Sequence, residues 1–135
     1  IRSRGLGDVY KRQPIYYIQY SYARTQSVLD KTNKIIDTQV LVTPELKNLY
    51  KKLLEWENVI KSAYQKKEVH LIAHYLESLS SYFHTLWSSS KNNPKAKFLD
   101  NDNNIPYDLH NLLSSYQDVL KDGLKILGIK PKLQM

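Results

Sequence analysis

The 135-residue sequence contains no cysteine and only four glycines. Without cysteine the chain can form neither disulfides nor thiolate metal sites, and this composition leads us to expect a cytoplasmic protein. No apolar run approaches the roughly 20 residues that a membrane-spanning helix needs, so we expect no membrane partner. The closely spaced pair Gly5 and Gly7 is not part of a phosphate-binding loop motif, and no HExxH metalloprotease motif occurs.

Patterns typical of catalysis are also missing. His70 and His74 have the i, i+4 spacing that can bind a metal ion on a helix, but no third ligand accompanies them in a recognisable pattern. Serine is frequent from residue 78 to 90 without a nucleophile motif. The sequence therefore predicts no catalytic residue, no metal site and no cofactor within this chain.

The first 13 residues, IRSRGLGDVYKRQ, differ in composition from the rest, because Arg24 is the only arginine beyond them. The stretch DVYKRQ corresponds to a translation of the end of a transposase sequencing adaptor. We therefore predict that residues 1–13 are a non-native leader, with a basic native leader as the alternative. The formal net charge is +7, and sixteen basic and twelve acidic residues from residue 14 onward leave +4. This excess is compatible with a nucleic-acid partner or with solubility alone.

Apolar residues recur at helical spacing in four segments of the remaining chain. The first predicted helix runs from about Tyr16 to Asp30, and the second begins at Thr43-Pro44-Glu45, a good N-terminal signal. The second stripe comprises Leu46, Leu49, Tyr50, Leu53 and Ile60. The third comprises Ile72, Leu76, Leu79, Phe83 and Leu86. The fourth comprises Leu109, Leu112, Leu113, Tyr116, Leu120 and Leu127.

Two glycines belong to the last of these helices. Gly123 lies on its apolar face, where a missing side chain would let another helix approach, and Gly128 is placed to cap its end. The only competing strand signal is the short stretch TQVLVT, which can equally be an extended connector. We predict an all-α fold, an antiparallel helical bundle of about four main helices over residues 14–135.

Tyrosines cluster at the start of the first predicted helix, in the stretch PIYYIQYSYAR. Tyr17, Tyr20 and Arg24 share one face of its helical wheel, about 120° from the face that we expect to be buried. That buried face carries Ile18, Tyr22, Thr25 and Leu29. Flat rings stack on unpaired bases, and a guanidinium can stack or donate paired hydrogen bonds. The tyrosine face therefore predicts an RNA-binding surface or, alternatively, a contact with another helix or domain.

Three stretches resemble the C-terminal anticodon-binding domain of arginyl-tRNA synthetases. YYIQYSYARTQSVL is similar to the YVQYAHAR…SV stretch that opens this domain. HLIAHYLESLSSYFHTLW resembles its YL-ELA-FH-FYN helix, and VLKDGLKILGIKPKLQM resembles its ending VL-NGL-LLGV-P-ERM. Order and spacing agree, and together the stretches span residues 14–135.

The resemblance implies a fragment of an arginine–tRNA ligase that lacks the catalytic domain and is inactive alone. The whole enzyme would use ATP with Mg²⁺, and this part would bind the anticodon loop of tRNA(Arg) rather than DNA. It would be monomeric apart from its contact with the catalytic domain of the same chain. By position, the resemblance implies five tRNA-binding residues: Tyr17, Tyr20, Arg24, Phe83 and Met135.

Two alternatives remain open at the level of sequence. One is the anticodon-binding bundle of another class I aminoacyl-tRNA synthetase, which a catalytic domain upstream in the same reading frame would distinguish. The other is a helical protein-interaction module that uses the tyrosine face as its contact patch and binds no RNA.

Overall fold

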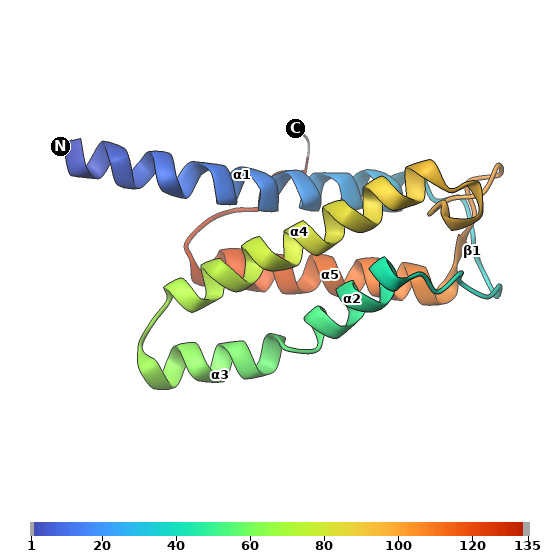
Figure 1. Ribbon diagram of the computed structural model, residues 1–135. Coiled ribbons are helices and arrows are strands. Elements are labelled where there is room, and N and C mark those ends of the chain that lie inside the picture. The colour runs from blue at the N-terminus through green and yellow to red at the C-terminus, as the bar shows by residue number, and fades with distance from the viewer. Residues whose placement is uncertain (1, 134–135) are drawn as a thin grey trace.

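Helices dominate the computed structural model, which describes residues 2–133, and the side chains of residues 15–133. The elements in chain order are α1 (Arg2–Lys31), β1 (Ile35–Ile36), α2 (Pro44–Leu53), α3 (Trp56–Lys66), α4 (His70–Asn92), the short 3-10 helix η1 (Pro94–Ala96), β2 (Ile105–Pro106) and α5 (Tyr107–Ile126). Helices α1 and α4 run in one direction across the molecule, while α2 and α5 run back (Figure 1). The arrangement confirms the predicted all-α helical bundle. No helix in the described part of the chain is both long and apolar enough to cross a membrane.

The helix boundaries differ from the prediction at two places. Helix α1 begins at Arg2 rather than near Tyr16. The second predicted helix is divided into α2 and α3, which places Ile60 on α3. At the break, the hydroxyl of Tyr75 from α4 donates to the carbonyls of Lys52 and Leu53, at 2.5 and 3.3 Å. Carbonyls at a helix end lack an intrahelical partner, so this contact from a distant helix stabilises the break.

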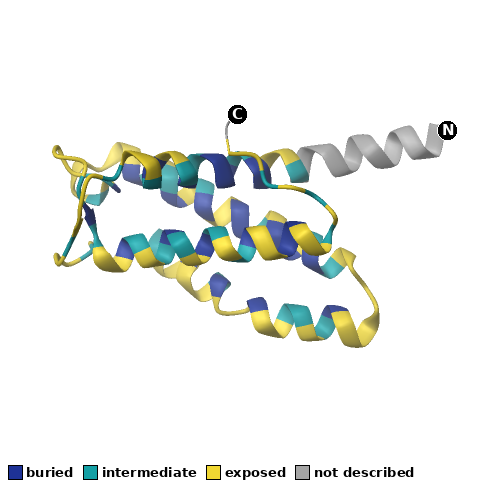
Figure 2. Cartoon of the chain, turned by 180° about the vertical axis from the view of Figure 1, so that it is seen from behind, coloured by how far each residue is buried: buried dark blue, intermediate teal, exposed yellow. Residues whose placement is uncertain are grey.

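Apolar residues of α1, α2, α4 and α5 meet in one core, in which buried positions alternate with exposed ones along each helix (Figure 2). Its centre contains Phe83 of α4 and Tyr116 of α5, whose rings stack with centroids 4.8 Å apart. The buried Tyr116 hydroxyl donates to Ser21 Oγ of α1 at 2.7 Å. Burial raises the pKa of the Tyr116 phenol, because ionisation would place a charge in the core. One tyrosine thus links three helices.

The two predicted glycine roles are confirmed. A Cβ atom on Gly123 would lie 2.7 Å from Cδ1 of the fully buried Leu76, so the absent side chain allows α5 to approach α4. Gly128 has a φ of +75° just past α5, where its amide donates to the Lys125 carbonyl at 3.0 Å. Thr43 caps α2 by accepting a hydrogen bond from the Leu46 amide at 3.2 Å.

Two long-range connections position the chain outside the helices. The two-residue strands β1 and β2 pair in parallel, with Ile35 opposite Ile105, and TQVLVT is an irregular connector. After α5 the chain returns to α1, where the buried amide of Gln19 holds it. Gln19 Nε2 donates to the Lys130 carbonyl at 2.9 Å, and Gln19 Oε1 accepts from the Lys132 amide at 2.6 Å. The C-terminal segment is thereby fixed across the tyrosine-bearing part of α1.

Candidate nucleic-acid interface

The buried and exposed faces of helix α1 are those that the helical wheel predicted. Ile18, Tyr22 and Thr25 are buried, and Leu29 is half-buried. On the other face, Tyr17 keeps 55% of its surface exposed, while Tyr20 and Arg24 are half-buried. The 3.6-residue period therefore places an aromatic and cationic face at the surface of the bundle.

Tyr20 and Arg24 form one rigid unit on this face. The Arg24 guanidinium donates from Nη2 to the Tyr20 hydroxyl at 2.6 Å, and its central carbon lies 4.2 Å from the Tyr20 ring centroid. Tyr16, one turn before Tyr20, stacks on it with centroids 6.0 Å apart. These contacts order a flat cationic group at the surface, and an ordered group loses less entropy when it binds.

Helix α4 adds two residues that the sequence interpretation did not assign to the site. Trp87 lies beneath the Arg24 guanidinium, 4.9 Å from ring centroid to Cζ. The His84 ring lies 5.8 Å from the Tyr20 ring, and its Nε2 is 3.3 Å from the Tyr17 carbonyl. We call Tyr16, Tyr17, Tyr20, Arg24, His84 and Trp87 the aromatic face. The α4 members are 60 or more residues from the α1 members in sequence, so a local pattern could not assign them to the same site.

The electrostatics of His84 follow from its position between the two helices. Partial burial lowers the pKa of the imidazole, and the nearby Arg24 charge lowers it further, while the hydrogen bond with the Tyr17 carbonyl opposes both effects. The net direction is downward from 6.5. Above that pH the ring is neutral, so Arg24 is the cation of the aromatic face.

This lowered pKa predicts a pH-dependent stability. As the pH falls below about 6.5, the unfolded chain takes up a proton at His84 before the folded chain does. The contribution of neutral His84 to the free energy of unfolding is therefore fully present above pH 6.5, and it is lost as the pH falls through the folded-state pKa. Urea unfolding from pH 8 to pH 5 should show a steeper loss of stability in the unaltered chain than in His84→Gln. Equal pH dependence in both proteins would contradict this assignment.

Two further site residues were implied by the resemblance. Phe83 is fully buried, with its ring between α4 and α5, and offers no surface to a ligand. This packing favours a core role, because the stacking on Tyr116 occupies the ring, and the implied contact of the Phe83 side chain with RNA stays a prediction. Met135 lies outside the described residues, and its role stays a prediction.

Histidines elsewhere do not assemble a metal site in the part of the chain that the structure describes, where no group of three or more His, Asp or Glu side chains converges. The His70 and His74 rings lie 5.8 Å apart, and Glu68 is 3.8 Å from His70. All three side chains are exposed.

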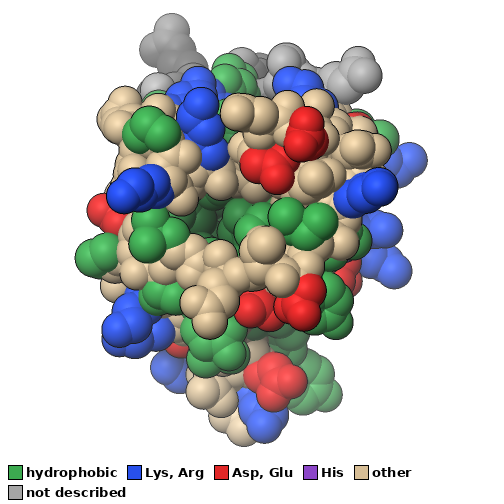
Figure 3. Space-filling view, turned by 90° about the vertical axis from the view of Figure 1, so that its right-hand side faces the viewer, with side chains coloured by type: hydrophobic (Ala, Val, Ile, Leu, Met, Phe, Trp, Pro, Cys, Tyr) green, Lys and Arg blue, Asp and Glu red, His purple; other side chains and the backbone are tan. Residues whose placement is uncertain are grey.

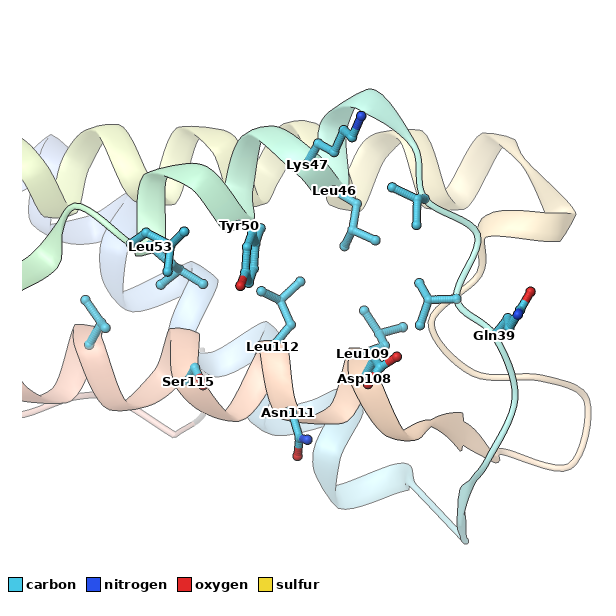
Figure 4. Close-up of a pocket in the computed structure, with 14 residues that line it drawn as sticks. Gln39, Leu46, Lys47, Tyr50, Leu53, Asp108, Leu109, Asn111, Leu112 and Ser115 are labelled. Atoms are coloured by element: carbon cyan, nitrogen blue, oxygen red, sulfur yellow. The ribbon is translucent and has the colours of Figure 1, made fainter.

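A large concavity lies apart from the aromatic face. It has a volume of about 820 Å³ and lies between α2, α5 and the connector at residues 39–42. Leu46, Tyr50 and Leu53 of α2 face Leu109 and Leu112 of α5 across it (Figure 4). Figure 3 views the right-hand side of the molecule as drawn in Figure 1, and it shows hydrophobic side chains gathered around a hollow. We call this concavity the α2–α5 groove. Its apolar walls suit a protein partner better than a polyanion.

Comparison with known proteins agrees with this geometry. The DALR anticodon binding domain matches residues 18–135. The arginine–tRNA ligase of Orientia tsutsugamushi strain Boryong is 35% identical over 130 residues, which cover 86% of this chain and 22% of that protein. The arginine–tRNA ligase of Pelagibacter ubique is 33% identical over 132 residues, covering 93% and 23%. This chain therefore spans less than a quarter of the length of these relatives.

A solved structure shares the fold. The crystal structure described as a putative arginyl-tRNA synthetase from Campylobacter jejuni superposes with a TM-score of 0.70 at 24% sequence identity. The superposition covers 93% of this chain and 27% of that one.

Proposed function

This chain belongs to the DALR anticodon-binding domain family, and from that premise we propose that it binds the anticodon loop of a tRNA. The observation that carries the proposal is the aromatic face itself. Tyr17 is an exposed ring, and Arg24 is a guanidinium held in a fixed position over Tyr20. Splayed loop bases are recognised by stacking on such rings and by hydrogen bonds to their edges. Surface lysines such as Lys91, whose Nζ lies 5.4 Å from the Trp87 ring centroid, would add salt-dependent attraction to phosphates.

The partner in this proposal is tRNA(Arg), and the whole protein is an arginine–tRNA ligase. The named relatives over most of this chain support it. Their additional length would contain the catalytic domain, which would use ATP with Mg²⁺. This part would supply tRNA binding and no catalytic residue. We include in the proposal a monomeric, cytoplasmic enzyme that acts on RNA and not on DNA.

Fluorescence anisotropy with a labelled anticodon stem-loop of tRNA(Arg) tests the proposal. We expect log Kd to rise linearly with the logarithm of the salt concentration. We also expect Kd to rise further when the middle anticodon base is changed. Arg24→Lys should lower the affinity by about tenfold, because an ammonium cannot reproduce the paired donors of a guanidinium. Equal affinity for the natural and the altered loop would contradict anticodon reading and leave only a basic surface.

A second candidate function, a helical protein-interaction module, is favoured by the α2–α5 groove. Its apolar residues include Tyr50 and Leu54, which are 55% and 63% exposed. The relatives are more than four times as long as the matched segment, so the occupant in this alternative is the remainder of a longer chain. A folded chain that binds no RNA at low salt would favour this alternative. RNA binding that survives substitution of Tyr50 would assign the two surfaces to different partners.

A further inference from the structure

A second concave surface adjoins the aromatic face at the end of the molecule where α1 and α4 terminate (Figure 1). Its volume is about 280 Å³. Three exposed lysines line it: Lys31 from the last turn of α1, Lys91 from the last turn of α4, and Lys97 just after η1. We call this surface the lysine pocket.

The charge of the lysine pocket is uncompensated by neighbouring side chains. No acidic residue lines it, and neither ion pair found among the described residues involves Lys31, Lys91 or Lys97. Cations near helix C-termini interact favourably with the helix dipole, which accounts for part of the placement of Lys31 and Lys91. Lys97 follows only a three-residue 3-10 helix, so the dipole does not account for it. Three ammonium groups around one cavity favour an anion there.

The remaining walls of the pocket are apolar and aromatic except for two serines, Ser27 and Ser90. Trp87 and Phe98 meet edge to face with centroids 5.6 Å apart, and Lys91 Nζ lies 5.4 Å from the Trp87 ring centroid. The indole Nε1–H of Trp87 is buried and has no hydrogen-bond acceptor within the described residues. Buried donors normally find an acceptor, so this unpaired indole N–H is a feature of the Trp87 environment that the protein itself does not satisfy. A cationic rim and an aromatic wall suit a single nucleotide.

The lysine pocket and the aromatic face are continuous through Trp87. The Arg24 guanidinium lies 4.9 Å from the Trp87 ring, which also lines the pocket. Along α1, Tyr17 and Lys31 are separated by about 21 Å at 1.5 Å per residue. That distance equals about six stacked nucleotides at 3.4 Å each. A single-stranded loop that contacts Tyr17 can therefore extend to Lys31.

We propose that the lysine pocket binds one nucleotide of the same RNA loop, away from the bases that contact Tyr17 and Arg24. The lysines hold its phosphate, and Trp87, which Phe98 packs against edge to face, contacts its base or ribose. This inference rests on the proposed anticodon-loop function. Because the contact is chiefly to a phosphate, it strengthens binding without regard to the identity of the base.

Paired lysine substitutions test the pocket in the same anisotropy assay. Lys31→Gln with Lys97→Gln should reduce the salt slope by about one and weaken binding by a similar factor for natural and altered loops. The matched control is Lys61→Gln with Lys66→Gln on α3, where Lys66 also occupies a last helical turn. The control pair removes the same net charge far from the pocket. Equal salt slopes and affinities in the two pairs would overturn the inference.

Tryptophan fluorescence provides a second measurement, which is read together with the lysine pairs because Trp87 borders both the aromatic face and the lysine pocket. The chain has two tryptophans, so Trp56→Phe leaves Trp87 as the only one, and a phenyl ring can still stack on Tyr75. We expect the stem-loop to change Trp87 emission, and inorganic phosphate at the same ionic strength to change it far less. The pocket would be overturned, and the proposed function left intact, by a combination of three results. Anisotropy would show binding, Trp87 emission would not change, and the two lysine double variants would have equal salt slopes and affinities. No RNA binding at all would overturn both.

Discussion

Replacing Phe83 with alanine should lower the free energy of unfolding by about 3–5 kcal/mol, the usual cost of removing a buried aromatic ring. Phe83 has no exposed surface, and its ring stacks on Tyr116 at 4.8 Å and lies 6.2 Å from Trp87. The vacated volume lies between α4 and α5, where both helices are held by other contacts and cannot close it. Urea unfolding followed by circular dichroism measures the loss.

Phe83→Leu separates packing from a direct contact with RNA. Leucine fills much of the same volume, so we expect a smaller loss of stability than with alanine. The folded Phe83→Leu chain should bind the anticodon stem-loop with nearly unaltered affinity, because the ring does not reach the surface. A large loss of RNA affinity in a chain of near-normal stability would contradict the packing role and restore Phe83 to the interface.

Tyr17→Ala should weaken binding of the anticodon stem-loop by about 5- to 150-fold. Stacking of a base on an aromatic side chain is worth roughly 1–3 kcal/mol, and each 1.4 kcal/mol changes the affinity tenfold. Tyr17 is the expected platform because 55% of its surface is exposed, whereas Tyr20 is half-buried between Tyr16 and Arg24. Anisotropy at fixed salt measures the change.

Tyr50 provides a matched control for this substitution. It is also a helical tyrosine with 55% of its surface exposed, but it lies on α2 beside the α2–α5 groove. Tyr50→Ala removes a ring of the same exposure as Tyr17→Ala does, and it should leave RNA affinity unchanged. Equal losses from Tyr17→Ala and Tyr50→Ala would contradict a specific role for the aromatic face.

The α1 part of the interface could be predicted from the sequence because it depends on one helical period. Tyr17, Tyr20 and Arg24 lie at offsets 0, 3 and 7, so a wheel places them together whatever the rest of the chain does. The α4 part could not be predicted in this way. His84 is 60 or more residues from its α1 partners, and nothing local to His84 or Trp87 indicates which side of α4 contacts α1.

Phe83 illustrates the opposite difficulty. Its position matched a residue that the family resemblance placed at the RNA, and it also lay on the apolar stripe of α4. Both readings agree with the sequence, because an aromatic ring suits a core and a base-stacking surface equally well. Only the position of Tyr116 on α5, whose ring stacks on Phe83, favours the core over the RNA-binding surface.

By itself, the sequence determined the helical class, the buried face of α1, the N-cap at Thr43 and the close approach at Gly123. Each of these depends on neighbours within about two helical turns or on a residue type with a narrow backbone role. Tertiary structure alone decided the break between α2 and α3 and the return of the C-terminal segment to Gln19. A tyrosine hydroxyl more than 20 residues away stabilises the first, and an amide more than 110 residues away holds the second. Hydrogen bonds over such separations leave no periodic pattern, since they depend on how finished helices pack.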